Sequence, residues 1–285
     1  MLSKRRGNKS TSRTLRKLER EIDIHSTVQE CPNVVQLYDA YEDAANVYLV
    51  MEFIQGKTLE KHLVDHGALS EHETALVMRE CLKVLAACHS RSILHGDIKG
   101  QNFLLSGTGA VAEQAGSSDL WLRAIDLGCS QRYRGTPFAT RVGTPVFMAP
   151  EVWSRHYGLE ADMWSLGILF YELLAARFPY WDTLDQCKTR TLDEVMKAVI
   201  VEEVTFDYGP WRTLSPAGLD FVQSLLQRDP AQRMTVKDAL RHPWLAEQLG
   251  KDSVDQRHNN ILPYGAPQPQ QQKGGRHVSG AACCP

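Results

Sequence analysis

A short polar segment holds the residue types that acid–base and phosphate chemistry need. Residues 95–102 read His-Gly-Asp-Ile-Lys-Gly-Gln-Asn and lie just before an apolar run. The carboxylate of Asp97 can take up a proton, the ammonium of Lys99 can neutralise an anion, and the amide oxygen of Asn102 can ligate a hard cation. Polar loops of this kind occur on many protein surfaces. The segment alone therefore does not establish a site.

A second acidic segment follows at Asp126-Leu127-Gly128, at the end of a strand-like run. Alone, this tripeptide is typical of a plain turn, but its order after the first segment changes its meaning. The chain here resembles the eukaryotic protein kinases. Their catalytic loop reads H-R-D-x-K-x-x-N in the serine/threonine branch, and their metal-binding motif reads D-F-G, here with leucine for phenylalanine.

The resemblance implies transfer of the γ-phosphoryl group of ATP to a serine or threonine hydroxyl of a protein substrate, with Mg²⁺ as cofactor. It makes Asp97 the acceptor of the hydroxyl proton and Lys99 the cation that steadies the transferring phosphate. Asn102 and Asp126 would ligate Mg²⁺. Thr144 would contact Asp97 and Lys99 rather than receive phosphate.

Three further segments follow in the order that the family has them. Residues 143–151 resemble the A-P-E end of an activation segment. Residues 162–167 resemble the start of the buried central helix, whose aspartate fixes the catalytic-loop backbone. Arg233 stands where the family has the ion-pair partner of Glu151. Five ordered motifs within residues 11–245 make chance agreement negligible.

Two segments narrow this resemblance to one group within the family. Residues 157–162 and 242–245 are similar to those of the calmodulin-dependent and plant-type calcium-dependent kinases. No EF-hand loop of the form D-x-[DN]-x-[DN]-G follows in the sequence. The sequence therefore gives no support to direct calcium sensing by this chain.

The resemblance also assigns a nucleotide site, made of one acidic helix residue and of apolar or backbone positions: Glu21, Met51, Glu52, Ile54, Leu104 and Ile125. Glu21 stands at the position of the family's αC glutamate, although a simple i to i+4 partner of Lys17 is the alternative. The Glu52 carbonyl and the Ile54 amide would bond adenine. Met51 would guard the back pocket, and Leu104 would form the floor.

The region before Glu21 departs from the family pattern, because neither a G-x-G-x-x-G loop nor a V-A-I-K lysine precedes it. The phosphates then lack a glycine-rich cover, and Glu21 lacks the lysine that holds it in register. A start assigned downstream of the true one is the preferred explanation, and a truncated, inactive product is the other. The matching alternative function is a pseudokinase-like scaffold that serves as a binding module.

Two departures bear on control and specificity. Gly96 replaces the arginine that clamps a phosphorylated activation loop in many relatives. We therefore expect weak or absent control by phosphates on the threonines of this segment, Thr136, Thr140 and Thr144. Lys57 and Gln101 stand where basic-directed relatives place glutamates, which argues against a strong preference for arginine-rich targets.

The elements that position these motifs form an expected α+β, kinase-like fold with two lobes. Residues 1–53 make a truncated small lobe, residues 54–249 a mainly helical large lobe, and residues 250–285 a disordered tail rich in proline and glutamine. In the small lobe, a basic helix carries three apolar residues on one face: Leu15, Leu18 and Ile22. Two strands at 34–38 and 47–53 are predicted to form a hairpin.

In the large lobe, the spacing of Ser70 and Glu73 predicts a capping box and a helix that runs to about His89. Short strands are predicted at 93–94, 103–105 and 122–125, with a surface insertion at 106–119 between the last two. The helix at 163–174 is apolar on nearly every side, so it belongs at the centre of the fold.

Composition limits the remaining function classes. The 285 residues with 43% apolar content can fill a core. A net charge of −2 argues against a nucleic-acid or anionic-membrane partner bound by bulk positive charge, including binding through the basic N-terminal helix. The seven cysteines have no CxxC spacing, which favours reduced thiols and a cytoplasmic location, with the nucleus as an alternative. The sequence contains no run of 18 apolar residues, so it predicts no transmembrane helix.

Overall fold

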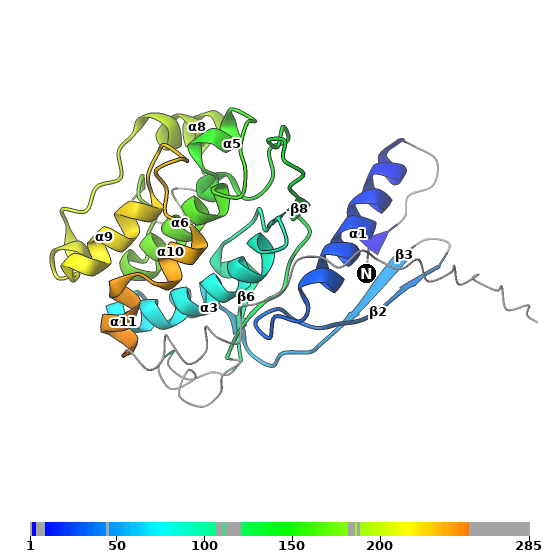
Figure 1. The fold of residues 1–285 in the computed structure, drawn as a ribbon, viewed down its shortest axis with the longest axis horizontal. Helices are drawn as coiled ribbons and strands as arrows, with labels where there is room; N and C mark the ends of the chain where they lie inside the picture. Colours follow the sequence, from blue (N-terminus) through cyan, green and yellow to red (C-terminus); the bar gives the residue numbers. More distant parts are fainter. Residues whose placement is uncertain are drawn as a thin grey trace, which may run out of the picture.

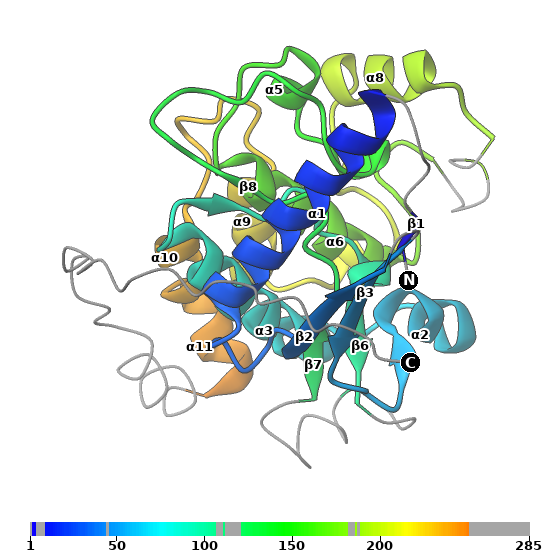
Figure 2. The same ribbon diagram turned by 90° about the vertical axis from the view of Figure 1, so that its right-hand side faces the viewer.

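Helix α1 (Lys9–Val28) and a small sheet form one side of the molecule, beside a larger helical body (Figure 1). The computed structural model describes residues 2–3, 9–43, 46–106, 111, 121–181, 186 and 189–250, with side chains from residue 15 onward. The mixture of helices and small antiparallel sheets confirms the expected α+β class. Turning the molecule by 90° shows α1 crossing the face of the larger body (Figure 2).

The sheet beside α1 has three antiparallel strands in the order β1-β3-β2. They are β1 (Leu2–Ser3), β2 (Leu37–Glu42) and β3 (Asn46–Met51). The sequence predicted only the hairpin of β2 and β3. The third strand is two residues long, too short for a pattern of alternating side chains to be read. Leu18, Ile24 and Val28 form the buried side of α1.

The first strand of the hairpin lies further along the chain than the predicted 34–38. Val34 instead makes a parallel bridge with Ala124, and the Val35 amide donates to the Ala124 carbonyl at 2.9 Å. Both valines are buried in this contact, whereas most of β2 is exposed. An exposed edge strand contains few of the buried apolar residues by which a strand is predicted from sequence. The prediction therefore placed the strand at the buried valines instead.

Two smaller sheets carry the loops around the site. The first has the order β4-β6-β7, from β4 (Lys57–Thr58), β6 (Phe103–Leu105) and β7 (Leu122–Ala124). The second pairs β5 (Ile93–Leu94) with β8 (Gln131–Arg132). The strands at 93–94 and 103–105 agree with the prediction, and β7 ends one residue earlier than predicted.

The helical body is organised around α6 (Ala161–Ala175), which is buried along almost its whole length. This confirms the central place expected for an apolar helix. Helix α3 (Glu71–His89) packs against α6 and begins with the predicted capping box of Ser70 and Glu73. The other helices are short: α2 (Leu59–His66), α5 (Pro150–Trp153), α8 (Leu192–Val201), α9 (Pro216–Leu225), α10 (Val236–Leu240) and α11 (Pro243–Leu249). The described residues also form three 3-10 turns: η1 (Gly100–Asn102), η2 (Pro145–Phe147) and η3 (Gly209–Arg212).

Two sequence predictions fall largely outside the described residues. They are the disordered tail, beyond Gly250, and most of the insertion at 106–119. Among the described helices, none combines the length and the apolar character that crossing a bilayer requires.

Candidate active site

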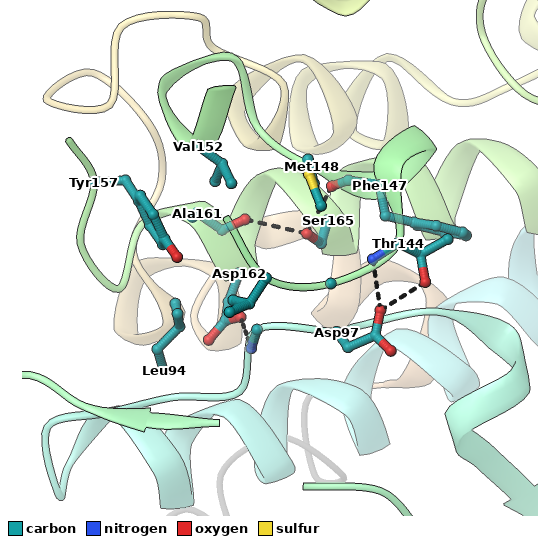
Figure 3. Close-up of a pocket in the computed structure, with 13 residues that line it drawn as sticks. Leu94, Asp97, Thr144, Phe147, Met148, Val152, Tyr157, Ala161, Asp162 and Ser165 are labelled. Atoms are coloured by element: carbon teal, nitrogen blue, oxygen red, sulfur yellow. Dashed lines mark hydrogen bonds between the residues drawn. The ribbon is translucent and has the colours of Figure 1, made fainter. Parts of the chain in front are cut away.

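The polar loop between β5 and η1 is fixed by one buried carboxylate in the first turn of α6. Asp162 accepts hydrogen bonds from the backbone amides of His95 and Gly96, each at 2.8 Å. His89 of α3 contacts the same carboxylate at 2.9 Å. The central helix thus sets the position of the loop that carries Asp97, as the sequence predicted for Asp162 (Figure 3).

His95 is the first residue of the loop after β5 and is fully buried. Burial lowers the pKa of its imidazole, although three nearby carboxylates, those of Asp162, Asp97 and Asp126, favour the charged form. The Ser130 hydroxyl donates to the His95 carbonyl at 2.9 Å. The loop and the segment after residue 126 are therefore joined at this histidine.

Asp97 is the most heavily hydrogen-bonded carboxylate of the site. Thr144 donates to its Oδ1 from the backbone amide at 2.9 Å and from the hydroxyl at 2.8 Å. Lys99 Nζ lies 2.8 Å from Oδ2, and the Asn102 amide nitrogen donates to Oδ2 at 3.1 Å. Lys99 also donates to the Thr144 hydroxyl at 2.8 Å. The structure thus brings all four predicted catalytic residues together. Figure 3 shows two of them, Asp97 and Thr144, with the hydrogen bonds between them.

This environment has a net effect on the ionisation of Asp97. Burial raises the pKa of the carboxyl, but the hydrogen bonds from Lys99 and Thr144, the charge of Lys99 and the bond from Asn102 outweigh burial, and the pKa lies below its usual value. Asp97 is therefore a carboxylate at neutral pH. Such a group can orient a hydroxyl and accept its proton.

Asp126 lies beside Asn102 because β6 and β7 are paired. Phe103 faces Ala124 across the ladder, and the Ile125 amide donates to the Asn102 carbonyl at 3.0 Å. Asp126 follows directly and is exposed, and its Oδ1 accepts from the Gly128 amide at 2.7 Å. Its carboxylate and the Asn102 amide oxygen are hard ligands of the type that Mg²⁺ uses.

Few protein ligands surround this pair. Among the described residues, no three His, Cys, Asp or Glu side chains gather into a metal-binding group. Mg²⁺ commonly needs only one or two protein oxygens together with phosphate oxygens and waters. The donor set of Asn102 and Asp126 fits that pattern.

Glu21 reaches the same place from α1. A methyl group built on Gly128 would lie 3.2 Å from Glu21 Oε2 and 3.1 Å from Asp126 Oδ1, so the two carboxylates flank this glycine. Burial raises the pKa of Glu21, and the negative charge of Asp126 raises it further, while Lys17 and Arg20 partly oppose the shift. Glu21 therefore points into the site.

The predicted adenine residues lie at the junction of the two parts of the molecule. Met51 ends β3 and is exposed, and Ile54 is half-buried in the segment that follows. Glu52 is held there: its amide donates to the Gln36 carbonyl at 2.8 Å, and its carboxylate pairs with Arg123 at 2.6 Å. Leu104, in β6 of the β4-β6-β7 sheet, and Ile125, which follows β7, are both half-buried.

The end of the predicted activation segment is tied to the core by an ion pair. Arg233, which is 4% exposed, makes two hydrogen bonds to the Glu151 carboxylate, one of them at 3.0 Å. It also donates to the Glu160 carbonyl at 3.0 Å and lies over the Trp164 ring. This is the pair that the sequence predicted.

Comparison with known proteins agrees with this geometry. The family model described as protein kinase domain matches residues 2–245. The chain belongs to the protein kinase family. It is similar to calcium/calmodulin-dependent serine/threonine-protein kinase 1 of Oryza sativa subsp. japonica, with 37% identity over 238 residues, which cover 83% of this chain and 37% of the relative.

Two further plant kinases show the same extent of similarity. CDPK-related kinase 1 of Arabidopsis thaliana is 38% identical over 83% of the chain and 39% of the relative. Calcium-dependent protein kinase 12 of Oryza sativa subsp. japonica is 36% identical over 81% of the chain and 40% of the relative. The chain spans about two fifths of the length of these curated relatives.

One departure of this kinase domain from the family pattern has a steric basis. Gly96 has a φ of +79°, and a methyl group on it would lie 2.8 Å from the Cys129 carbonyl oxygen. Any larger residue requires this backbone to move. This crowding gives a local reason why glycine rather than arginine stands at position 96. The expectation of weak control by activation-segment phosphates stays a prediction.

Sequence reasoning missed two acidic residues of this kinase domain. Glu172 lies in α6 and Glu60 in α2, and both line a cavity next to Lys99 and Thr144. Glu172 had a signal in the sequence, since it is an acidic residue within an otherwise apolar helical stretch. Glu60 had none, because it looks like any exposed residue in the first turn of a helix.

Proposed function

We propose that the chain transfers the γ-phosphoryl group of ATP to serine or threonine hydroxyls of a protein substrate. The observation that carries the proposal is the hydrogen-bonded Asp97 carboxylate, whose partners Lys99, Asn102 and Thr144 hold it ionised. Family membership and the similarity to serine/threonine kinases support it.

In the proposed reaction, a bond forms between the substrate hydroxyl oxygen and the γ-phosphorus as the bond to the β-phosphate oxygen breaks. The hydroxyl proton passes to Asp97, and ADP leaves. Lys99 lies 2.8 Å from both Asp97 and the Thr144 hydroxyl, where its charge can offset that of the transferring group. Thr144 orients Asp97 through its two hydrogen bonds.

Asn102 and Asp126 are the proposed holders of Mg²⁺. When bound, Mg²⁺ would neutralise negative charge on the phosphates. Asn102 directs its amide nitrogen to Asp97, so the opposite end of the amide is the end that can ligate a cation. Glu21 lies beside Asp126 and is the proposed partner of a phosphate-binding cation, as in the resemblance.

The adenine site is proposed at the junction of the two parts. The Glu52 carbonyl and the Ile54 amide would bond the base, with Met51 behind it and Leu104 and Ile125 beneath it. The ion pair of Glu52 with Arg123 and its backbone bond to Gln36 support this role, because they fix the backbone that would meet the base.

Location and regulation are proposed more coarsely. Four free cysteines in the described residues, Cys31, Cys81, Cys88 and Cys129, are consistent with a reducing cytoplasmic or nuclear location. Two of these relatives are named for their dependence on calcium. A calcium-linked activator is proposed to act from outside this chain, which has no EF-hand sequence. No nucleic-acid partner is proposed.

The test replaces Asp97 by asparagine in the chain as it exists and measures incorporation of radiolabelled phosphate into a generic protein substrate. Asp97→Asn keeps the shape and removes the proton acceptor, so incorporation should fall to background. Asp207→Asn is the matched control, because Asp207 is exposed and distant in sequence from the motifs. Unchanged incorporation in Asp97→Asn would show that the catalytic assignment is wrong.

A further inference from the structure

Three aromatic rings pack in series beside the catalytic loop. The ring centroids of Tyr133 and Phe138 are 5.6 Å apart, and those of Phe138 and Tyr157 are 5.3 Å apart. Phe138 and Tyr157 are both buried, and the Phe138 amide donates to the Tyr157 carbonyl at 2.8 Å. The activation segment is therefore attached at Phe138 to the stretch of chain that precedes α6.

The hydroxyl of Tyr157 makes a second contact with the activation segment, two residues further along. It donates to the Thr140 carbonyl at 2.6 Å. The structure describes every residue from 134 to 141, and Phe138 is the only buried side chain in that range. Because the Thr140 carbonyl belongs to the fourth residue before Thr144, this hydrogen bond restricts the path by which the chain reaches Asp97.

Tyr157 also lies next to the proposed phosphoryl-transfer site. Its side chain lines the same cavity as Asp97, Gly143 and Thr144. Figure 3 shows Tyr157, Asp97 and Thr144 around this space. The volume of the cavity is about 10 Å³, roughly that of one water-sized probe, so it leaves no room for a ligand larger than a water. Closely packed groups transmit displacements to one another. A shift of Tyr157 would therefore reach Thr144.

The segment around Thr144 is held on its other side as well. The Ser165 hydroxyl, in α6, donates to the Phe147 carbonyl at 2.8 Å. Thr144 thus lies between two backbone carbonyls that accept from buried or half-buried hydroxyls of the helical body. The hydroxyl on the upstream side comes from Tyr157 rather than from the catalytic loop, because Gly96 has no side chain to offer.

The Tyr157 hydroxyl is suited to a permanent donor role. Burial raises the pKa of Tyr157 to about 12, so the hydroxyl keeps its proton at neutral pH. Phenylalanine would fill the same space and would lose the hydrogen bond to the Thr140 carbonyl. The contribution of the hydroxyl can therefore be separated from that of the ring.

We propose that Tyr157 is a positioning residue for phosphoryl transfer, which holds Thr144 on Asp97 through the Thr140 carbonyl. The inference rests on the proposed function, because Thr144 is the residue that orients the proton acceptor. Tyr157 acts through Thr144 and not on the substrate. Loss of its hydroxyl loosens residues 140–143, so the Thr144 contact with Asp97 opens more often and turnover falls.

The first test measures the Thr144 contact and needs no turnover. Hydrogen exchange, followed by mass spectrometry, is compared for peptides that contain the Thr144 amide, which donates to Asp97. Tyr157→Phe should speed this exchange by about threefold to tenfold, as expected for the loss of one hydrogen bond that local opening breaks. Tyr180→Phe is the matched control, because the Tyr180 hydroxyl has no hydrogen-bond partner in the described part of the chain. It should leave the exchange of Thr144 within about twofold.

The second test is kinetic. Tyr157→Phe should lower kcat for a serine peptide by about threefold to tenfold and leave the KM for ATP within about twofold. In a chain that already carries Thr144→Val, the same substitution should lower kcat by less than about twofold, because the contact through which Tyr157 acts is already weakened. Equal losses of kcat in both backgrounds would show that Tyr157 does not act through Thr144 and would overturn the proposal.

An independent variant guards against a general effect of altering Tyr157. Phe138→Leu keeps an apolar side chain and removes the ring contact with Tyr157, so it should also speed exchange of the Thr144 amide. Unchanged exchange in both Tyr157→Phe and Phe138→Leu overturns the proposal, even if their overall stability falls. If exchange depends on the Tyr157 hydroxyl but the unmodified chain transfers no phosphate, the proposed function fails and the positioning contact stands.

Discussion

Gly143 lies so close to Gly96 that a methyl group on Gly143 would come within 2.3 Å of the Gly96 carbonyl oxygen. Both residues have positive φ angles, +94° for Gly143 and +79° for Gly96. Backbone therefore meets backbone at the point where the activation segment approaches the catalytic loop. This contact delivers Thr144, the next residue, to Asp97.

Substitution of Gly143 should be much more costly than substitution of a glycine with similar backbone geometry. Gly135 has a φ of +81° with nothing within 4 Å of a methyl group, so Gly135→Ala should cost only the left-handed strain, about 1–2 kcal/mol. Gly143→Ala adds a backbone collision and should cost at least about 2 kcal/mol more. Urea unfolding of both variants gives the comparison. Equal losses would mean that the Gly96 contact is not tight.

The hydroxyl of Thr144 should matter for turnover. Thr144→Val keeps the shape and the amide bond but leaves Asp97 and Lys99 each without one partner, which should lower kcat roughly tenfold to a hundredfold. Thr144→Ser keeps the hydroxyl and should stay near the activity of the unmodified chain. Steady-state kinetics on one peptide separates the two. A rise in KM with unchanged kcat in Thr144→Val would contradict the proposed orientation of Asp97.

The buried pair of Arg233 and Glu151 should contribute far more to stability than an exposed pair. Arg233→Ala leaves an uncompensated carboxylate and should cost about 3–5 kcal/mol. Arg190, which precedes α8, and Glu194, in its first turn, form an exposed pair at 3.2 Å, so Arg190→Ala should cost under about 1 kcal/mol. Thermal and chemical unfolding of both variants test the difference. Similar losses would show that the buried pair is not the anchor of the activation segment.

Glu172 should give stability a measurable pH dependence. Its pKa is about 8 in the folded chain, above the ordinary glutamate value, so the folded state binds the proton more tightly than the unfolded state. The associated stability is present in acid and is lost as the pH rises toward 8, with a slope of at most about 1.4 kcal/mol per pH unit. Relative to Glu172→Gln, the unmodified chain should therefore lose stability between pH 5 and pH 8. Parallel curves for the two chains would contradict a buried neutral carboxyl.

Much of the site could be predicted from the sequence because its residues are contiguous or follow fixed motifs. Asp97, Lys99 and Asn102 fall within six positions, and Thr144 follows a recognisable glycine. The cavity with Glu60 and Glu172 could not be predicted in this way. Those residues are far apart along the chain and come to line one cavity only in the folded chain.

The fold was predicted best where burial is one-sided or complete. Helix α3, with its capping box, and the apolar helix α6 were placed to within a few residues. Strand β2 was misplaced because it is mostly exposed, whereas Val34 and Val35 join a different sheet through long-range contacts. Such contacts leave no local pattern in the sequence.

The anchoring of the catalytic loop by Asp162 divides the site into two mechanical units. Asp97 and Thr144 take their frame from the large helical body, whereas Glu21 arrives on α1 and contacts the site at Gly128. A hinge rotation of α1 and its sheet would change the spacing of Glu21 and Asp126 while the proton acceptor kept its geometry. Under the proposed function, a change in the position of α1 would therefore leave the hydrogen bonds on the phosphoacceptor side intact.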